Sequence, residues 1–300
     1  MITIADARRI PTTRGGDDEL ALPLGPDDAL ESVGPFVMIA RHRIADLEPG
    51  ALPVDADVRP HPHIGLAALS YVLEGAVTHR DSLGHRRELI AGDVGLTVAG
   101  RGVVHSERFE RMRLLGGTLD MFQMLASLPD GLEELEPSFA HAVVVPDARI
   151  PNASVRTIAL PDGRGALRFP TTTLLVDVSF DAETSYLVPD AVERALYVFA
   201  GELRVGDVRV QRGRIARLPT TCATIVGSSG ARCLVFGGDP VGPRWMWWNY
   251  LHSSVERIEV AKQAWRDGRD PLPVGDTESF TPAPADGGRP LRRIAPRAAP

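Results

Sequence analysis

Short apolar runs separated by turn-forming residues fill the chain from Pro35 to about Phe139. Turn signals that contain glycine stand between the runs, at residues 74–75, 82–84, 91–93 and 100–102. Strands at this regular spacing are typical of a β-sandwich or a β-barrel. The runs themselves cover residues 36–40, 66–73, 76–79, 94–98, 114–119 and 120–125.

A second strand-rich block runs from Thr172 to about Gly238 and echoes the first. The segment Tyr71-Val-Leu-Glu-Gly75 matches Tyr197-Val-Phe-Ala-Gly201 at an offset of 126 residues. A glycine turn at 91–94 falls near a similar turn at 212–215. The echo indicates an internal duplication or, because it is short, a chance similarity. In both cases the second block has the strand pattern of another sandwich or barrel.

The segments outside the two blocks have different patterns. Residues 1–35 are polar and irregular, and we expect them to form a wrapping arm. Residues 130–170 carry repeated prolines and look like a connector. We therefore expect residues 1–140 to form a first barrel with its arm. Residues 141–170 are expected to connect it to a second barrel with a helix and tail, over residues 171–300.

A single helix is predicted near the C-terminus, after the aromatic run at 245–250. Ser253 or Ser254 can cap it, and Glu256 stands where a capping box needs an acid. Gly268 is a natural stop, and beyond about Asp270 the abundance of Pro, Gly and Arg predicts a loose tail. The helix should pack an apolar stripe on a barrel, because apolar residues recur at helical spacing: Val255, Ile258, Ala261 and Trp265.

Composition narrows the class of protein. With 44% apolar residues among 300, the chain can bury a full core. The net charge of −6 argues against direct binding to nucleic acid, because no excess of Lys and Arg is present to neutralise phosphates. No apolar run is long enough to span a bilayer, and the N-terminus lacks the apolar region of a signal peptide. We expect a cytoplasmic protein without membrane or nucleic-acid partners.

The two cysteines, Cys222 and Cys233, agree with a reducing compartment. Their spacing resembles neither a disulfide framework nor a thiolate zinc site. They could approach each other across a hairpin, although we expect a free buried thiol rather than a redox pair.

The candidate metal-binding residues lie in two pairs with i, i+2 spacing: His61-Pro-His63 and, after 41 intervening residues, His105-Ser-Glu107. In a strand, i and i+2 side chains point to the same face, so four side chains can converge if the two strands are neighbours. Three imidazoles and one carboxylate are donors for a first-row transition metal. The alternative is that these are ordinary barrel histidines satisfied by hydrogen bonds. His79 could lie in the layer around such a site.

The second block lacks such residues at the matching positions. At an offset of 126, His61 and His63 fall opposite Leu187 and Pro189. The glycine turns match at an offset of about 121, which places His105 and Glu107 near Val226 and Ser228. We therefore expect the second barrel to keep the architecture without the site.

The motifs resemble a known family. His63 to Gly75 is similar to the first half of a cupin motif, and Ala91-Gly-Asp93 with Gly100-Arg-Gly102-Val-Val-His105 is similar to the second half. The typical cupin glutamate, about four residues after the second histidine, is replaced here by Ala67, which makes Glu107 the expected fourth ligand. Jointly the following pieces, within residues 30–275, resemble pirin: His61-Pro-His63-Ile-Gly65, Tyr71–Gly75, His79-Arg-Asp-Ser82, Ala99–Glu107, Gly237–Pro243, Trp247-Trp-Asn249 and Ser253–Arg257.

The resemblance implies an all-β bicupin: two cupin-type β-barrels with a short C-terminal helix. Pirins hold iron in the N-terminal barrel, and the family's ligand positions fall here on His61, His63, His105 and Glu107. We expect Fe(II), and Mn, Ni, Cu or Zn are compatible with the same donors. On a six-coordinate iron these ligands leave two positions open, whereas on a tetrahedral zinc they close the site.

Three functions follow from the resemblance. The first is a metal-dependent dioxygenase of the quercetinase type, which cleaves a flavonol-like small aromatic substrate and in which Glu107 also acts as a catalytic base. The second is a metal-dependent, redox-sensitive regulator that binds a protein partner in transcription or metabolism. The third is a bicupin whose metal is purely structural. Leu96 and Ala67 depart from the family pattern, and we expect both to lie close to the pocket.

Overall fold

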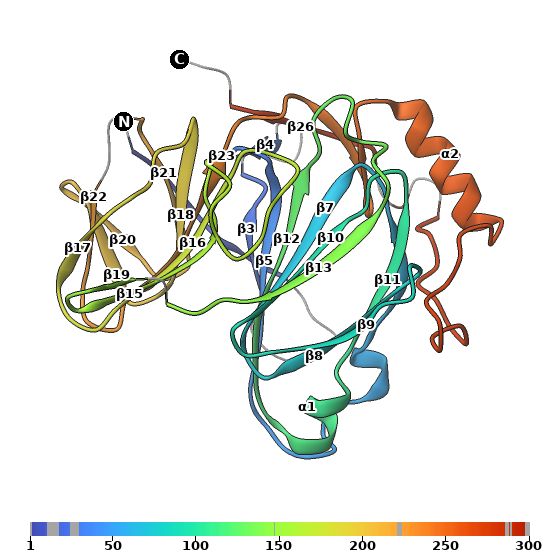
Figure 1. The fold of residues 1–300 in the computed structure, drawn as a ribbon, viewed down its shortest axis with the longest axis horizontal. Coiled ribbons are helices and arrows are strands. Elements are labelled where there is room, and N and C mark those ends of the chain that lie inside the picture. The colour runs from blue at the N-terminus through green and yellow to red at the C-terminus, as the bar shows by residue number, and fades with distance from the viewer. Residues whose placement is uncertain are drawn as a thin grey trace.

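The computed structural model describes residues 2–10, 18–24, 30–146, 148–220, 224–285, 288 and 290–297. Two β-barrels lie side by side, each made of a large sheet that faces a small one (Figure 1). A further four-stranded sheet joins the two ends of the chain. The prediction of an all-β protein with two barrels and a short C-terminal helix is confirmed.

The first barrel pairs a seven-stranded with a four-stranded sheet, and all its strand pairs are antiparallel. In sheet order, the large sheet consists of β13 (Ser138–Val143), β10 (Asp93–Val98), β7 (Leu66–Glu74), β12 (Gly117–Ser127), β5 (Phe36–Leu47), β3 (Asp18–Leu22) and β2 (Arg8–Ile10). The small sheet consists of β6 (Val58–His63), β11 (Val103–Arg108), β8 (Ala76–Asp81) and β9 (Arg86–Ile90).

The second barrel repeats this plan. Its large sheet consists of β1 (Thr3–Asp6), β21 (Arg214–Leu218), β18 (Glu193–Ala200), β23 (Arg232–Gly238), β16 (Thr173–Phe180), β15 (Ala153–Ala159) and β14 (Ala148–Ile150). Its small sheet consists of β17 (Thr184–Leu187), β22 (Thr224–Gly227), β19 (Glu202–Val205) and β20 (Val208–Gln211).

The remaining elements are few. The end-joining sheet contains β25 (Tyr250–His252), β24 (Arg244–Trp247), β26 (Arg292–Pro296) and β4 (Leu30–Ser32), the last two in parallel. The helices are a 3-10 turn η1 (Val54–Ala56), α1 (Glu110–Leu115) and α2 (Val255–Arg266). None of the described helices is long and apolar enough to cross a bilayer.

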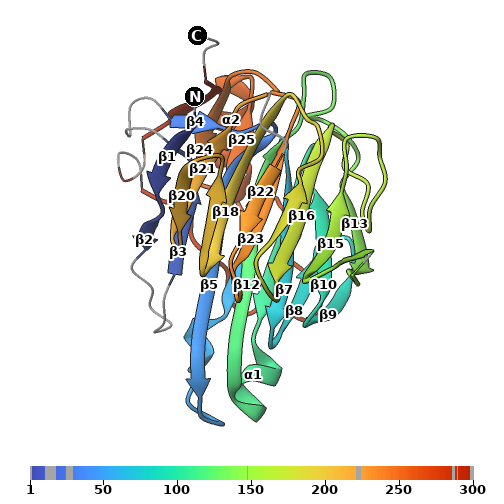
Figure 2. The ribbon, with the colours of Figure 1, turned by 90° about the vertical axis from the view of Figure 1, so that its left-hand side faces the viewer.

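The two large sheets pack face to face, so their central strands are buried on both sides (Figure 2). On β7, Leu69 and Tyr71 join the cluster between the barrels, whereas Val72 points into the first barrel. On β18, Tyr197 joins the same cluster, whereas Leu196 points into the second barrel. This alternation follows from the period of two along a strand. Because burying one such side chain stabilises the fold by about 1.5–3 kcal/mol, the cluster makes one body of the two barrels.

The echo in the sequence falls on equivalent strands. Tyr71 lies on β7, between β10 and β12, and Tyr197 lies on β18, between β21 and β23. Each hydroxyl donates across the interface to a carboxylate of the other side: Tyr71 to Asp177 at 2.7 Å, and Tyr197 to Glu19. Burial raises the pKa of both phenols, so both stay protonated as donors.

The connecting segments contain strands that the sequence analysis did not predict. Within residues 141–170, expected as a connector, β13 ends in the first large sheet, and β14 and β15 extend the second. In the described part of the arm, β1 pairs with β21 of the second barrel, and β3 pairs with β5 of the first. Residues 11–17 and 25–29 of the arm lie outside the described residues. The tail has no helix or strand over its described residues up to Leu291, but its last strand, β26, pairs with both β24 and β4.

Helix α2 forms as predicted and returns to the first barrel (Figure 1). The Ser254 hydroxyl accepts a hydrogen bond from the backbone N–H of Arg257 at 3.1 Å, which is an N-cap. Ile258 and Ala261 are buried in a cluster with Ile64 of the first barrel. The aromatic run before the helix packs into the same cluster. Cys233 is a free buried thiol, whereas Cys222 lies outside the described residues.

Candidate metal centre

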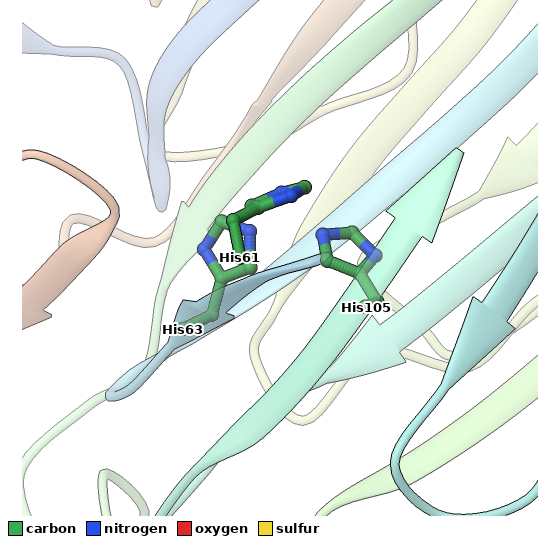
Figure 3. Close-up of side chains that lie close together, drawn as sticks. All are labelled: His61, His63 and His105. Carbon is green, nitrogen blue, oxygen red and sulfur yellow. The ribbon is translucent and has the colours of Figure 1, made fainter. Parts of the chain in front are cut away.

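The three histidines of the two motifs converge inside the first barrel (Figure 3). Strands β6 and β11 are antiparallel neighbours, with His105 directly opposite His61. One ligand atom from each of His61, His63 and His105 lies within 4.8 Å of the others, and all three residues are buried. Within the described residues, no other group of His, Cys, Asp and Glu side chains has this geometry.

Glu107 lies beside this group rather than within it. The register of β11 against β6 shifts between His105 and Glu107, which marks a β-bulge or irregularity. Glu107 is only 2% exposed, and its Oε1 lies 3.6 Å from Nδ1 of His105. Bulges next to active sites re-aim side chains. The structure therefore brings all four predicted residues to one part of the barrel, with the histidines in the tightest group.

Backbone carbonyls orient two of the histidines. The Nδ1–H of His61 donates to the carbonyl of Arg59 at 2.9 Å, and the Nδ1–H of His63 donates to the carbonyl of Asn249 at 3.0 Å. A histidine whose Nδ1–H is held in this way presents Nε2 as a lone-pair donor, which is the usual arrangement of a metal-binding imidazole.

The remaining two side chains have buried polar atoms that a metal ion would satisfy. Both ring nitrogens of His105 and the Oε2 atom of Glu107 are buried without a hydrogen-bond partner among the described residues. Leaving such a group unpaired costs about 1–3 kcal/mol. An ion bound between the imidazoles and the carboxylate would remove that cost. The residues present therefore fit a first-row transition metal.

The electrostatics favour the metal-binding form of the histidines. Burial, with a further contribution from the neighbouring His61, lowers the pKa of both His63 and His105 well below the ordinary value. Both imidazoles are therefore neutral around pH 7. Because only the neutral form can bind a metal, the site needs no proton release from these two rings.

Several residues around the site escaped the sequence analysis. Gln123 on β12 donates from Nε2 to Oε1 of Glu107 at 3.2 Å, and it was visible as the polar exception in an apolar run. Phe139 stacks on His79 at 4.2 Å, and the His79 ring lies 5.5 Å from that of His105. Nε2 of His79 is paired with Asp81 at 3.0 Å, so His79 lies in the layer around the histidine group.

The expectation that Ala67 and Leu96 lie close to the pocket was wrong. Both belong to the apolar cluster between the two barrels. Their neighbours Ala68 and Gly95 face the other way: Ala68 packs with Leu66 and Leu125, and a Cβ on Gly95 would lie 2.9 Å from Leu89. The alternation along β7 and β10 turns positions 67 and 96 away from the histidines. Neither departure from the family pattern therefore changes the lining of the site.

Comparison with known proteins agrees with this geometry. A family model described as Pirin matches residues 19–125, and the model of the Pirin C-terminal cupin domain matches residues 174–271. A pirin-like protein of Caulobacter vibrioides is 37% identical over 266 residues, which are 86% of this chain and 92% of that protein.

Two solved structures share the fold. Quercetin 2,3-dioxygenase from Acinetobacter baumannii matches with a TM-score of 0.80 at 22% identity, over 95% of each chain. The pirin YhhW of Escherichia coli, in complex with nickel(II), matches with a TM-score of 0.63 at 20% identity, over 80% of this chain and 100% of that one. With both family models matched in order along the sequence, the chain belongs to the pirin family.

Proposed function

We propose that this pirin is a metal-dependent dioxygenase that acts on a small aromatic substrate of the flavonol type. The buried histidine group, with the unpaired atoms of His105 and Glu107 beside it, carries the proposal. The name of the Acinetobacter baumannii structure supports the substrate class.

His61, His63, His105 and Glu107 would hold the metal ion. We propose Fe(II), while the nickel(II) in the Escherichia coli pirin supports tolerance of other first-row ions, with Mn, Cu and Zn as further candidates. When bound, the ion would supply the Lewis-acid and redox chemistry of the reaction.

Glu107 has a second role in this proposal. Its Oε1 accepts the hydrogen bond from Gln123, so Oε2 is the oxygen left for an ion or for a proton. A buried carboxylate that is free on one oxygen can take the proton of a substrate hydroxyl. Gln123 keeps the carboxylate in one orientation while the proton moves.

The test is aerobic turnover by protein reloaded with one metal at a time. Apo protein would be loaded anaerobically with Fe(II), Mn(II) or Ni(II), and quercetin would be added in air-saturated buffer. Oxygen uptake and a ring-opened product are expected with at least one metal, and neither is expected with His105→Ala. Fully loaded protein that consumes no oxygen would count against the proposal.

A regulator that binds a protein partner is the second candidate. It is favoured by two leucines at the end of α1 on the first barrel, since Leu114 is 74% and Leu115 is 60% exposed. Partner capture that depends on the loaded metal would favour this function. Capture that is the same for apo, reduced and oxidised protein would weaken it.

A purely structural metal is separated from both by His63→Ala. If the ion served only the fold, this variant would unfold at a lower temperature than the wild type but would keep the wild-type activity.

A further inference from the structure

The segment that follows α2 crosses the outside of the strands that carry the metal-site residues. We call residues 275–281 the C-terminal strap. In Figure 1 the chain after α2 runs down beside β11. The Trp265 side chain of α2 fixes its far end, because the indole Nε1–H donates to the carbonyl of Thr281 at 3.0 Å. Near the start, Arg80 on β8 donates to the carbonyl of Gly275 at 2.8 Å.

Asp276 is the buried anchor of the strap, with 8% exposure. Its Oδ2 accepts a hydrogen bond from the Ser106 hydroxyl at 2.5 Å and from Nε of Arg108 at 2.8 Å. Its Oδ1 accepts a second bond from the Arg108 guanidinium. One carboxylate therefore holds the two residues that flank Glu107 on either side.

The hydrogen bonds to Asp276 lie at the irregular part of β11. Ser106 stands between His105 and Glu107, where the register against β6 shifts. Against β8, on its other side, β11 keeps one register from His105 to Arg108, so the irregularity is confined to its pairing with β6. Because Asp276 holds Ser106 and Arg108 on the outer face, the intervening Glu107 stays turned into the barrel.

The strap also touches the other ligand strand. The backbone N–H of Thr281 donates to the carbonyl of Pro60 at 2.9 Å, and its hydroxyl donates to the carbonyl of Arg59 at 3.2 Å. The same Arg59 carbonyl accepts the Nδ1–H of His61. The strap therefore contacts both β6 and β11 from the side opposite the metal site.

We propose that Asp276 is a positioning residue for the metal centre, acting through β11 on His105 and Glu107. This inference rests on the proposed metal site. Residues outside the ligand layer that orient ligands typically account for about 10–100-fold in metal affinity. Since Asp276 acts through the backbone of β11, we expect the lower end of that range.

The experiment compares Asp276→Asn with Glu278→Gln in the full-length protein. Both replace an acid with its amide, but Glu278 is exposed on the same strap. Asparagine presents an amide N–H₂ to Arg108 and cannot accept from it at both atoms. Each apo protein would be titrated with Co(II), whose visible absorption spectrum reports ligand geometry. Asp276→Asn should bind Co(II) about 10-fold more weakly and with an altered spectrum, whereas Glu278→Gln should match the wild type.

Two further variants separate positioning from loss of fold. Ser106→Ala removes one hydroxyl on β11 and should shift the Co(II) affinity in the same direction by a smaller factor. Asp276→Glu keeps the carboxylate and should restore most of the affinity and the wild-type spectrum. Thermal unfolding of the apo proteins identifies any variant that fails to fold, and Ser106→Ala then decides.

The outcomes are distinguishable. Wild-type affinity and spectrum in both Asp276→Asn and Ser106→Ala would overturn the role of Asp276 and leave the metal site intact. A wild-type protein that binds neither Co(II) nor Ni(II) would overturn the metal site itself, whatever Asp276 does.

Discussion

The two barrels differ at equivalent strands. In the first barrel, β6 and β11 pair antiparallel and bring three histidines and a glutamate into the interior. In the second barrel, β17 and β22 pair in the same way, but the side chains that enter the interior there are Tyr186 and Ile225. In both barrels, the pairing of these two strands brings side chains from distant parts of the sequence together in the interior. Whether this part of the interior can bind a metal depends on which side chains the two strands turn inward.

The comparison also corrects the alignment made from the sequence offset. That offset matched His61 to Leu187, yet Leu187 is 69% exposed. The residues that face inward are its neighbours, Tyr186 and Val188. A one-residue error turns the comparison to the wrong face of the strand. The inward-facing residues are still not His, Cys, Asp or Glu, and among the described residues the second barrel has no group of such side chains that could hold a metal ion.

The largest expected effect comes from removing a donor in the first barrel. His105→Ala should weaken Co(II) binding by about 1,000-fold or more, because a direct ligand should matter more than the 10–100-fold of an outer-layer residue. Isothermal titration of the apo protein measures the change. The free energy of unfolding of the apo protein should change little, because removal of two buried, unpaired ring nitrogens offsets the cost of the cavity. Unchanged Co(II) affinity would remove His105 from the site.

The matching change in the second barrel should act on stability instead. Ile225→Ala empties part of a fully buried apolar cluster, which should lower the free energy of unfolding by about 2–5 kcal/mol. Denaturant unfolding measures this loss. Its Co(II) affinity should equal that of the wild type. A parallel loss of metal binding would show that the barrels are coupled more tightly than the contacts indicate.

Removing the hydroxyls of the two tyrosines between the barrels should lower the free energy of unfolding less than Ile225→Ala does, and by different amounts. Tyr197→Phe should cost about 2 kcal/mol of stability, since hydrogen bonds to charged groups are worth about 1.5–3 kcal/mol. Tyr71→Phe should cost about 1 kcal/mol, because its acceptor Asp177 keeps two bonds from Arg232. The Glu19 carboxylate, in contrast, pairs with Arg212 at the longer distance of 3.7 Å. Equal losses in thermal unfolding would contradict this ranking.

The smallest effect concerns pH at a contact between the arm and the second barrel. Burial raises the pKa of Glu193, whose carboxylate accepts the backbone N–H of Gly34 at 2.7 Å. The raised pKa means that the folded state favours protonated Glu193. The stabilisation that this gives the fold is complete below the ordinary pKa of 4.5 and is lost as the pH rises through the higher folded-state pKa. Glu193→Gln should therefore gain stability relative to the wild type above that window and not below it.

Unfolding measured from pH 4 to pH 8 tests this slope. Glu183→Gln, at an exposed position of the same barrel, is the control and should leave the slope unchanged. A Glu193→Gln curve that stays parallel to the wild type would contradict the prediction.

The sequence predicted the site better than its surroundings. The i, i+2 spacing placed His61, His63, His105 and Glu107 on common faces, because strand geometry fixes that relation locally. The carbonyl of Asn249 that orients His63 is 186 residues away and is a backbone group, so no side-chain pattern marks it. Asp276 lies 170 residues from Ser106 in a segment whose composition suggests a loose tail. Its role depends on a tertiary contact that composition does not encode.

Each end of the chain is attached to the barrel that lies farther from it in sequence: β1 to the second barrel, and the C-terminal strap to the first. A cut in the middle of the gene would therefore not release two working modules. One fragment would carry the histidines without the carbonyl and carboxylate that hold them, and the other would have lost an edge of its sheet. The two halves therefore depend on each other for their structure.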